Sequence, residues 1–293
     1  MDIVFDDSYR YDNWDHVFPV IKYRMLYEKI QEYAGNMLMV HRPVSPSEDT
    51  LALIHTREYL DDLLNCRQTP ITMSSEFPLF PELINGMRMM AGGSILAAEV
   101  ALEEGAAFHV GGGFHHAFAG HAEGFCYFND IAIGAQCVLN ETGKKVLVID
   151  LDVHQGNGTA RIFQGNDSVF TFSVHQENNY PEKQKSDLDI GLEDGIEDEA
   201  YLKALDQGLA IIEQKFSPDL VFYVAGVDLH CNDQLGGLSL TDEGVYKRDR
   251  RVMEFCKSKG VPVVVVLAGG YSLKIEDTVK LHFGACKAMH EVF

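Results

Sequence analysis

The chain has 293 residues, of which 46% are hydrophobic and 23% charged, as in an ordinary globular protein. Its formal net charge of −20 argues against direct nucleic-acid binding, which relies on Lys and Arg, and suits a cationic partner or simple solubility. The acidic start lacks the apolar core of a secretory signal, and the longest apolar run, Val261–Ala268, is too short to span a bilayer. None of the six cysteines forms a C-x-x-C pair, and we expect a reducing, cytoplasmic setting.

Predicted helices and strands alternate along the chain. The spacing of apolar residues predicts helices over Pro19–Ala34, Thr56–Leu64, Gly86–Glu103, Asn129–Asn140, Leu202–Gln214 and Asp242–Ser258. Short apolar runs predict strands at Ile3–Phe5, Met37–Val40, Ala106–Val110, Val146–Ile149, Val221–Val224 and Val261–Leu267. Arg67–Pro81 and the acidic segment Asp187–Glu199 are expected to be loops. Such alternation is typical of a parallel α/β sheet, and the absence of a Pro/Ser-rich linker favours one domain over residues 1–293.

Four of the predicted strands lead directly to polar residues of the kind that bind metals or transfer protons. These residues are His115 and His116 after Ala106–Val110, Asp150, Asp152 and His154 at and after the end of Val146–Ile149, Asp228 after Val221–Val224, and Tyr271 after Val261–Leu267. In an open parallel sheet, ligands bind beyond the carboxyl ends of the strands. We therefore expect one crevice to collect all of these side chains, an arrangement that suggests metal-assisted hydrolysis.

The segment Asp150-Leu151-Asp152-Val153-His154 alternates polar and apolar residues, so an extended chain would place its polar side chains on one side. Asp and His supply the oxygen and nitrogen ligands of a divalent ion, and Asp228 is the best candidate for a third ligand. Three protein ligands and an open position are typical of catalytic zinc, although iron or cobalt also fits this set. The alternative is a group of buried carboxylates that backbone amides satisfy.

The tandem histidines His115 and His116 follow a glycine-rich turn, and histidine is the usual proton-transfer group near neutral pH. Each imidazole needs an orienting partner, for which Asp150 and Asn157 are candidates. Tyr271 could donate a hydrogen bond to a developing oxyanion. Its alternative role is that of a packed aromatic residue.

Four long segments resemble the zinc-dependent histone deacetylase superfamily. They are GGGFHHAFAGHAEGFCYFNDIAI (Gly111–Ile133), VLVIDLDVHQGNGT (Val146–Thr159), AGVDLHCNDQLGGLSLT (Ala225–Thr241) and LAGGYS (Leu267–Ser272). The resemblance extends from HVFPVIKYRML (His16–Leu26) to Tyr271, and Phe77–Glu99 looks most like the class IV branch and its bacterial relatives. It implies an arginase-like α/β domain whose central, mainly parallel sheet has eight strands flanked by helices.

The resemblance also implies a role for each matching residue. Asp152, His154 and Asp228 match the zinc ligands, His115 and His116 the proton-handling pair, Asp150 the carboxylate that orients the first histidine, and Tyr271 the tyrosine that polarises the acyl carbonyl. Phe125 and Tyr180 resemble the aromatic walls of the acyl-lysine tunnel, beside Gly124, and Asp150, Asp152, His154, Ser173 and Val174 would hold a structural potassium ion. Asn157 departs from class I members, which have an orienting aspartate here, so His116 should be less basic.

The function expected from this resemblance is removal of acetyl or longer acyl groups from the Nε amine of lysine, in a protein or peptide. A small-molecule amidohydrolase acting on acetylated polyamines or similar amides is the first alternative, because the acidic charge suits either cationic substrate. A non-catalytic acyl-lysine binder is the second alternative, and an arginase-type ureohydrolase is disfavoured because a two-metal ligand set is not apparent.

Overall fold

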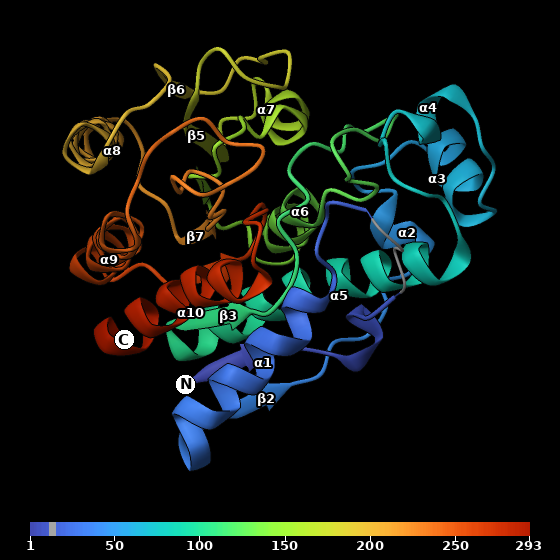
Figure 1. Cartoon of the computed structure of the whole chain (residues 1–293). Coiled ribbons are helices and arrows are strands. Elements are labelled where there is room, and N and C mark those ends of the chain that lie inside the picture. Colours follow the sequence, from blue (N-terminus) through green and yellow to red (C-terminus); the bar gives the residue numbers. More distant parts are fainter. Residues whose placement is uncertain (12–15) are drawn as a thin grey trace.

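A central parallel sheet, covered by helices on both faces, organises the computed structural model, which describes residues 1–11 and 16–293 (Figure 1). The sheet has eight strands in the order β2-β1-β3-β8-β7-β4-β5-β6, and every neighbouring pair is parallel. The strands are β1 (Asp2–Val4), β2 (Met39–His41), β3 (Ala106–His109), β4 (Val146–Asp150), β5 (Val169–Gln176), β6 (Leu188–Leu192), β7 (Leu220–Val224) and β8 (Val263–Val266). The predicted eight-stranded α/β fold is thus confirmed, with a sheet that is entirely parallel.

The helices form two layers and a smaller group at one end of the sheet. One layer contains α5 and α6 with α7 beside them, and the other runs from α1 through α10 and α9 to α8 (Figure 1). The helices are α1 (Ile21–Ala34), α2 (Glu48–Leu51), α3 (Arg57–Leu64), α4 (Pro70–Met73), α5 (Pro81–Glu104), α6 (Asp130–Thr142), α7 (Asn157–Phe163), α8 (Asp198–Lys215), α9 (Asp242–Lys259) and α10 (Ile275–Val292), with short 3-10 turns at Asp7–Tyr9 and Gly35–Met37.

The central strands read as unbroken apolar runs because both of their faces are covered. Every residue of β3, β4, β7 and β8 is buried, which is typical of a parallel sheet between two helical layers. Local sequence then sets where the neighbouring helices begin and end. Asn129 caps α6 by accepting from the amide of Ala132, and Gly260 ends α9 in the left-handed conformation.

The six predicted helices and six predicted strands are all present, with ends shifted by a few residues. Two predicted loops are wrong in part. Asp187–Glu199 contains the edge strand β6 and the start of α8, because Leu188, Ile190 and Leu192 alternate and pack against the core. Arg67–Pro81 contains the short helix α4, which begins at Pro70, a residue suited to a first helical turn.

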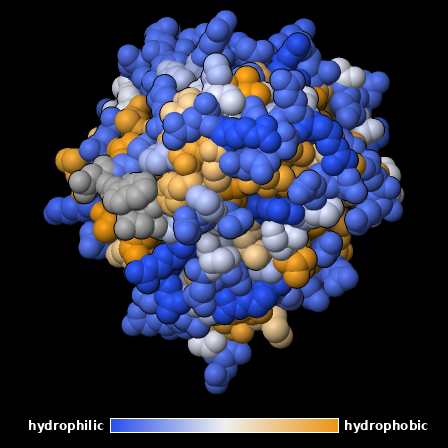
Figure 2. Space-filling view, turned by 90° about the vertical axis from the view of Figure 1, so that its right-hand side faces the viewer, coloured by the Kyte–Doolittle hydropathy of each residue, from blue (hydrophilic) through white to orange (hydrophobic). Residues whose placement is uncertain are grey.

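The surface agrees with the acidic composition. Figure 2 shows a face on which hydrophilic side chains predominate, with apolar side chains gathered near its centre. Across residues 1–11 and 16–293, none of the helices is both long and apolar enough to span a membrane.

Candidate active site

The four strands that lead to the predicted polar residues are neighbours at the centre of the sheet, in the order β3-β8-β7-β4. All four are parallel, so their carboxyl ends open onto the same edge. The segments that follow them therefore converge although the first of them, at His115, and the last, at Tyr271, are more than 150 residues apart in the chain. This convergence is the geometric condition for a shared crevice.

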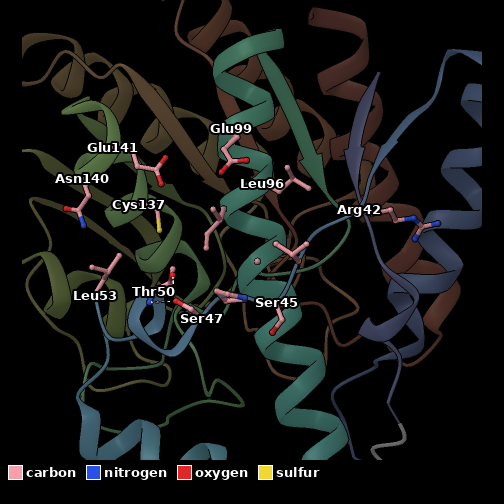
Figure 3. Close-up of a pocket in the computed structure, with 14 residues that line it drawn as sticks. Arg42, Ser45, Ser47, Thr50, Leu53, Leu96, Glu99, Cys137, Asn140 and Glu141 are labelled. Atoms are coloured by element: carbon pink, nitrogen blue, oxygen red, sulfur yellow. Dashed lines mark hydrogen bonds between the residues drawn. The ribbon is translucent and has the colours of Figure 1, made fainter.

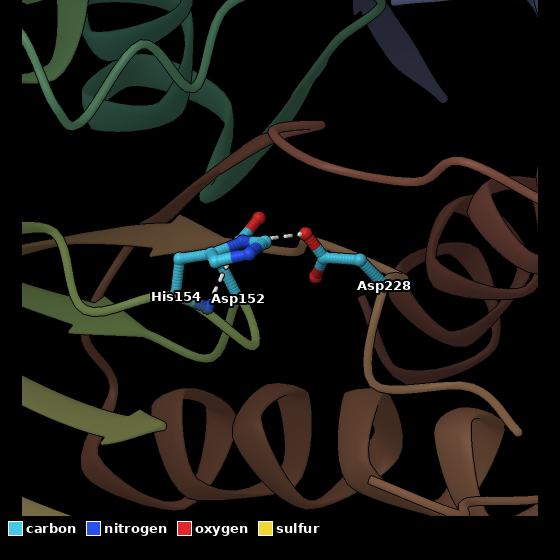
Figure 4. A group of neighbouring side chains, drawn as sticks. All are labelled: Asp152, His154 and Asp228. Atoms are coloured by element: carbon cyan, nitrogen blue, oxygen red, sulfur yellow. Dashed lines mark hydrogen bonds and ion pairs between the residues drawn. The ribbon is translucent and has the colours of Figure 1, made fainter. Parts of the chain in front are cut away.

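Three side chains at this edge form a group that could hold a metal ion. His154 Nδ1 lies 3.1 Å from Asp152 Oδ1 and 3.1 Å from Asp228 Oδ2, and one ligand atom of each residue lies within 4.8 Å of the others (Figure 4). All three residues are buried, and Asp228 is fully inaccessible. The structure thus brings together the three residues predicted to bind metal.

Backbone amides satisfy only part of this carboxylate group. Gly269 N donates to Asp152 Oδ2 at 2.8 Å, and Val153 N donates to Asp228 Oδ1 at 2.9 Å. In each carboxylate the other oxygen faces His154. Asp152 Oδ1 also accepts from the amide of His154 at 2.9 Å. Backbone amides thus orient both carboxylates, and one oxygen of each still faces the imidazole at the centre of the group.

The charges of the group favour a bound cation. Burial and the nearby Asp152 carboxylate raise the pKa of Asp228 to about 7, since two buried negative charges repel each other. Burial lowers the pKa of His154, but its hydrogen bonds to Asp152 and Asp228 outweigh burial and raise it to about 10. A proton on His154 thus supplies the positive charge that a divalent ion would bring, and two oxygens with one imidazole nitrogen fit such an ion.

The loop after β8 approaches the metal-binding group closely at Gly269. A Cβ atom on this residue would lie 2.0 Å from Asp228 Oδ2 and 2.6 Å from Asp152 Oδ2. Only glycine therefore allows the backbone to lie against both carboxylates.

The two tandem histidines lie beside this group with different partners. His115 Nδ1 is 2.8 Å from Asp150 Oδ2, and His116 Nδ1 is 2.8 Å from Asn157 Oδ1. The two ring centroids are 4.1 Å apart, and both residues are buried. Both predicted orienting partners are thus in contact with the imidazoles.

These partners divide the pair into a charged and a neutral imidazole. Burial lowers the pKa of His115, but the charges of Asp150 and Asp152 outweigh burial and raise it to about 9. Burial, together with the positive charges of His115 and His154, holds the pKa of His116 well below its usual value. His116 is therefore the imidazole available to accept a proton, and paired groups with divergent pKa values are typical of acid–base catalysis.

Tyr271 is held at the same crevice through its backbone. Its amide donates to Asp233 Oδ2 at 2.6 Å, and its carbonyl accepts from Gln234 Nε2 at 2.7 Å. The ring packs against Phe18 and Phe125, with centroids 6.3 and 6.2 Å away. Burial and the Asp228 charge raise the pKa of the phenol, so the hydroxyl stays protonated and can donate.

A cavity of about 260 Å³ leads to these groups. Its lining includes the predicted tunnel residues Gly124, Phe125 and Tyr180 together with His116, His154 and Tyr271. Gly124 and Phe125 both have positive φ, at 52° and 64°, in a tight turn closed by the pairing of Glu123 with Cys126. A Cβ on Gly124 would lie 2.4 Å from His116 Cδ2, so the turn needs glycine at this position.

The remaining predicted residues lie on the adjacent strand. Asp150 on β4 is the register partner of Ser173 on β5, and Val174 follows Ser173. A potassium site at these residues stays a prediction.

Three residues near the crevice are missing from the predicted set. Lys22 is fully buried, and its ammonium donates to the carbonyl of Ala268 at 2.6 Å. Asp233 anchors the amide of Tyr271, and Glu123 contacts both Asn157 and Tyr180. All three lie within the segments that carry the family resemblance, but no local spacing indicates where their side chains point.

A larger hollow of about 560 Å³ lies between α5, α6 and the segment after β2 (Figure 3). Its polar lining includes Glu99, Glu141 and Arg42. None of the described residues that line it is a histidine, and the convergent imidazoles and carboxylates belong to the smaller cavity.

The fold is an all-parallel α/β sheet, and its carboxyl edge carries a buried Asp-His-Asp group and two imidazoles. These features place the chain among α/β proteins with a candidate hydrolytic metal centre. Comparison with known proteins gives the family. The model of the Histone deacetylase domain matches residues 16–286, and the chain belongs to this family.

Several known proteins are similar to this chain in sequence or structure. An uncharacterized protein of Picosynechococcus sp. is 40% identical over 283 residues, covering 95% of this chain and 94% of the relative. Histone deacetylase 2 of Arabidopsis thaliana is 33% identical over 244 residues, covering 78% of this chain but only 62% of the plant protein's length. The crystal structure of the HDA15 HD domain superposes with a TM-score of 0.83 at 24% identity, covering all of this chain and 90% of that one, which shows the shared fold.

Proposed function

We propose that this chain is a metal-dependent hydrolase that removes acetyl or longer acyl groups from the Nε amine of lysine. The observation that carries the proposal is the convergence of the Asp152-His154-Asp228 group, a neutral His116 and a protonated Tyr271 on one cavity. The aromatic walls formed by that cavity suit the apolar stem of a lysine side chain. Zinc is the proposed metal, with iron or cobalt as alternatives.

A divalent ion held by Asp152, His154 and Asp228 would polarise the acyl carbonyl and increase the acidity of a water molecule. The residues around it do the rest. His116 Nε2 accepts a proton from the attacking water and later returns it to the leaving amine. Tyr271 donates a hydrogen bond to the carbonyl oxygen as negative charge develops there.

His115 has a different role in this mechanism because its partner is a carboxylate. Asp150 keeps it positively charged, and a charged imidazole 4.1 Å from the His116 ring opposes protonation of that ring. His116 thus gains a proton only transiently, which keeps it an effective acid for the leaving amine.

The acyl group would lie in a small cavity of about 20 Å³ that borders Asp152 and His154. Its lining also includes Phe18, Phe114 and Cys126. This volume is close to the space of one water molecule. Acetyl is therefore the proposed preferred acyl group, and longer chains require these side chains to move.

A second candidate substrate is an acetylated polyamine. The exposed carboxylate of Glu76 lines the cavity, and Glu123 lies beside Tyr180 at the same opening. These negative charges, with the net charge of −20, favour a cationic substrate of either kind.

Four further proposals rest on the family resemblance. They are a class IV affiliation, supported by Phe77–Glu99, a structural potassium ion held by Asp150, Asp152, His154, Ser173 and Val174, a single catalytic domain over residues 1–293, and a cytoplasmic location. All six cysteines are free thiols in the structure, which suits a reducing compartment.

The test is to incubate the zinc-loaded protein with acetyl-lysine peptides, longer acyl-lysine peptides and acetylated polyamines, and to measure free amine. His116→Ala should lower turnover by about 10²–10⁴-fold, and Tyr271→Phe by about 10²–10³-fold. His290→Ala, near the end of α10, is the matched control and should leave turnover unchanged. Tight peptide binding without product would instead identify a non-catalytic acyl-lysine binder, and an inactive zinc-loaded protein that binds neither substrate would refute the proposal.

A further inference from the structure

His116 is oriented by a neutral amide, and this amide is itself held by a carboxylate. Asn157 Oδ1 lies 2.8 Å from His116 Nδ1, and Asn157 Nδ2 donates to Glu123 Oε1 at 2.6 Å. Asn157 is 1% exposed, so its side chain has no access to bulk water. The three groups form a chain of hydrogen bonds from the imidazole to the edge of the cavity.

Two contacts set the direction of the hydrogen bonds in this chain: Glu123 at Asn157 Nδ2, and the amide of Gly158, which donates to Asn157 Oδ1 at 3.0 Å. An ionised carboxylate can only accept, so the group of Asn157 that faces it must be the donating Nδ2. Oδ1 then faces His116 and can only accept, which requires a proton on His116 Nδ1. In a neutral imidazole this leaves the Nε2 lone pair free for proton transfer.

Glu123 is ionised and fixed in place by further partners. Its Oε1 also accepts from the hydroxyl of Tyr180 at 3.2 Å, and its Oε2 lies 3.5 Å from His121 Nε2. Burial raises the pKa of Glu123, but the hydrogen bonds from His121, Asn157 and Tyr180 outweigh burial and lower it. The turn from Glu123 to Cys126 fixes the backbone at the same place.

We propose that Glu123 is a positioning residue, which through Asn157 holds His116 in the tautomer with a free Nε2 and at the same time anchors the cavity wall at Tyr180. The inference rests on the proposed function for its effect on turnover. Its effect on the tautomer of His116 does not depend on any activity. In this chain Asn157 thus stands between His116 and the carboxylate that orients it, and that carboxylate belongs to Glu123.

The decisive variants remove or relocate this carboxylate. Glu123→Leu leaves Asn157 Nδ2 without its acceptor and only the amide of Gly158 to orient the Asn157 side chain. The side chain should then sample other orientations, and kcat should fall about 10–100-fold, the usual effect of losing such an outer partner. Glu123→Gln keeps an acceptor oxygen and should recover most of kcat. Glu254→Leu, which removes an exposed carboxylate paired with Arg250, is the matched control and should leave kcat unchanged.

Asn157→Asp distinguishes a positioning role from a merely structural one, because the change should raise kcat in the Glu123→Leu variant and lower it in the original protein. In Glu123→Leu, an aspartate at this position accepts directly from His116 Nδ1 and should restore kcat to within a few-fold of the original protein. In the original protein, the same change places two carboxylates about 2.6 Å apart and should lower kcat. An equal loss of kcat in both backgrounds would overturn the proposal.

Nitrogen NMR of the histidine rings in the zinc-loaded protein gives a readout that needs no substrate. The original protein should show one His116 tautomer, protonated at Nδ1, and Glu123→Leu should show a mixture of tautomers. If the protein cleaves none of the amides but the tautomer changes as expected, the positioning role holds and the proposed function fails. If Glu123→Leu keeps both the single tautomer and the kcat of the original protein, Glu123 has no positioning role.

Discussion

Arg248 connects the two strand ends that lead to the aspartates of the candidate metal site, Asp152 and Asp228, and its removal should weaken both the fold and the site. The side chain is fully buried on α9 and donates to the carbonyls of Leu151, at 3.0 Å, and Gly226. Leu151 directly precedes Asp152, and Gly226 lies two residues before Asp228. The guanidinium also pairs with the fully buried Asp249 at 2.6 Å.

The cost of losing Arg248 follows from what remains. In Arg248→Met, Asp249 keeps only the hydroxyl of Tyr223 as a partner, so a buried charge is left without its counter-ion. Breaking such a pair costs about 3–5 kcal/mol, a large part of the ~5–15 kcal/mol that stabilises a typical protein. The exposed pair of Arg250 with Glu254 gives the matched control, because Arg250→Met should cost only about 0.3–0.5 kcal/mol.

Replacing both members of the buried pair distinguishes the effect on the stability of the fold from the effect on zinc binding. The double variant Arg248→Met/Asp249→Leu removes both charges and should regain most of the free energy of unfolding, measured by urea denaturation of the metal-free protein. It still lacks the donors to Leu151 and Gly226, so its affinity for zinc should stay weakened by about tenfold or more, in a competition titration. A loss below about 1 kcal/mol in Arg248→Met, or zinc affinity at the original level in the double variant, would refute this account.

Three further predictions concern the site and its support. Gly269→Ala should weaken zinc binding at least tenfold, because the new Cβ would lie 2.0 Å from Asp228 Oδ2. The control is Gly284→Ala, within α10 and free of close contacts, which should preserve zinc affinity and stabilise the protein by about 0.8–1 kcal/mol. Equal zinc affinities of the two variants would contradict this prediction. Burial lowers the pKa of His109 to about 3, so the stabilising contribution of the neutral imidazole is present above pH 6.5 and is lost as the pH falls toward 3, by about 1.4 kcal/mol per pH unit. In urea denaturation of the metal-free protein, His109→Asn should reduce this pH dependence of the free energy of unfolding. An unchanged pH dependence would count against the prediction. Chelation of zinc should lower stability by about 2.7 kcal/mol relative to protein at a free zinc concentration 100 times Kd, and an unchanged unfolding temperature would argue against zinc binding.

The positions of the candidate metal-binding and acid–base residues could be predicted because they follow strands that have a simple sequence pattern. β4 and β7 are buried on both faces and read as unbroken apolar runs, so the polar residues after them stand out. The rule that ligands bind at the carboxyl edge then places Asp152 and Asp228 together without knowledge of the strand order. What this rule does not provide is the distance between the side chains, which depends on the adjacency of β4 and β7.

The missed features depend on contacts that leave no local pattern. β6 has only three inward residues, Leu188, Ile190 and Leu192, within an acidic segment, and as an edge strand it is only half buried. Glu123 lies 34 residues from Asn157 and meets it only because the turn before Cys126 points toward the start of α7. Sequence spacing predicts which residues share an element, whereas partners on separate loops are set by the packing of the whole sheet.

The short segment from Asp150 to Asn157 explains how neighbouring imidazoles acquire opposite properties. It starts at the end of β4 and reaches the first turn of α7, and it supplies an orienting partner for each histidine. A carboxylate at its start stabilises the positive charge of His115, and an amide at its end offers His116 no charge. Since the rings share nearly the same burial, the difference between their pKa values comes from the charges around them. Asp150 and Asp152 stabilise a proton on His115, whereas the positive charges of His115 and His154 oppose one on His116.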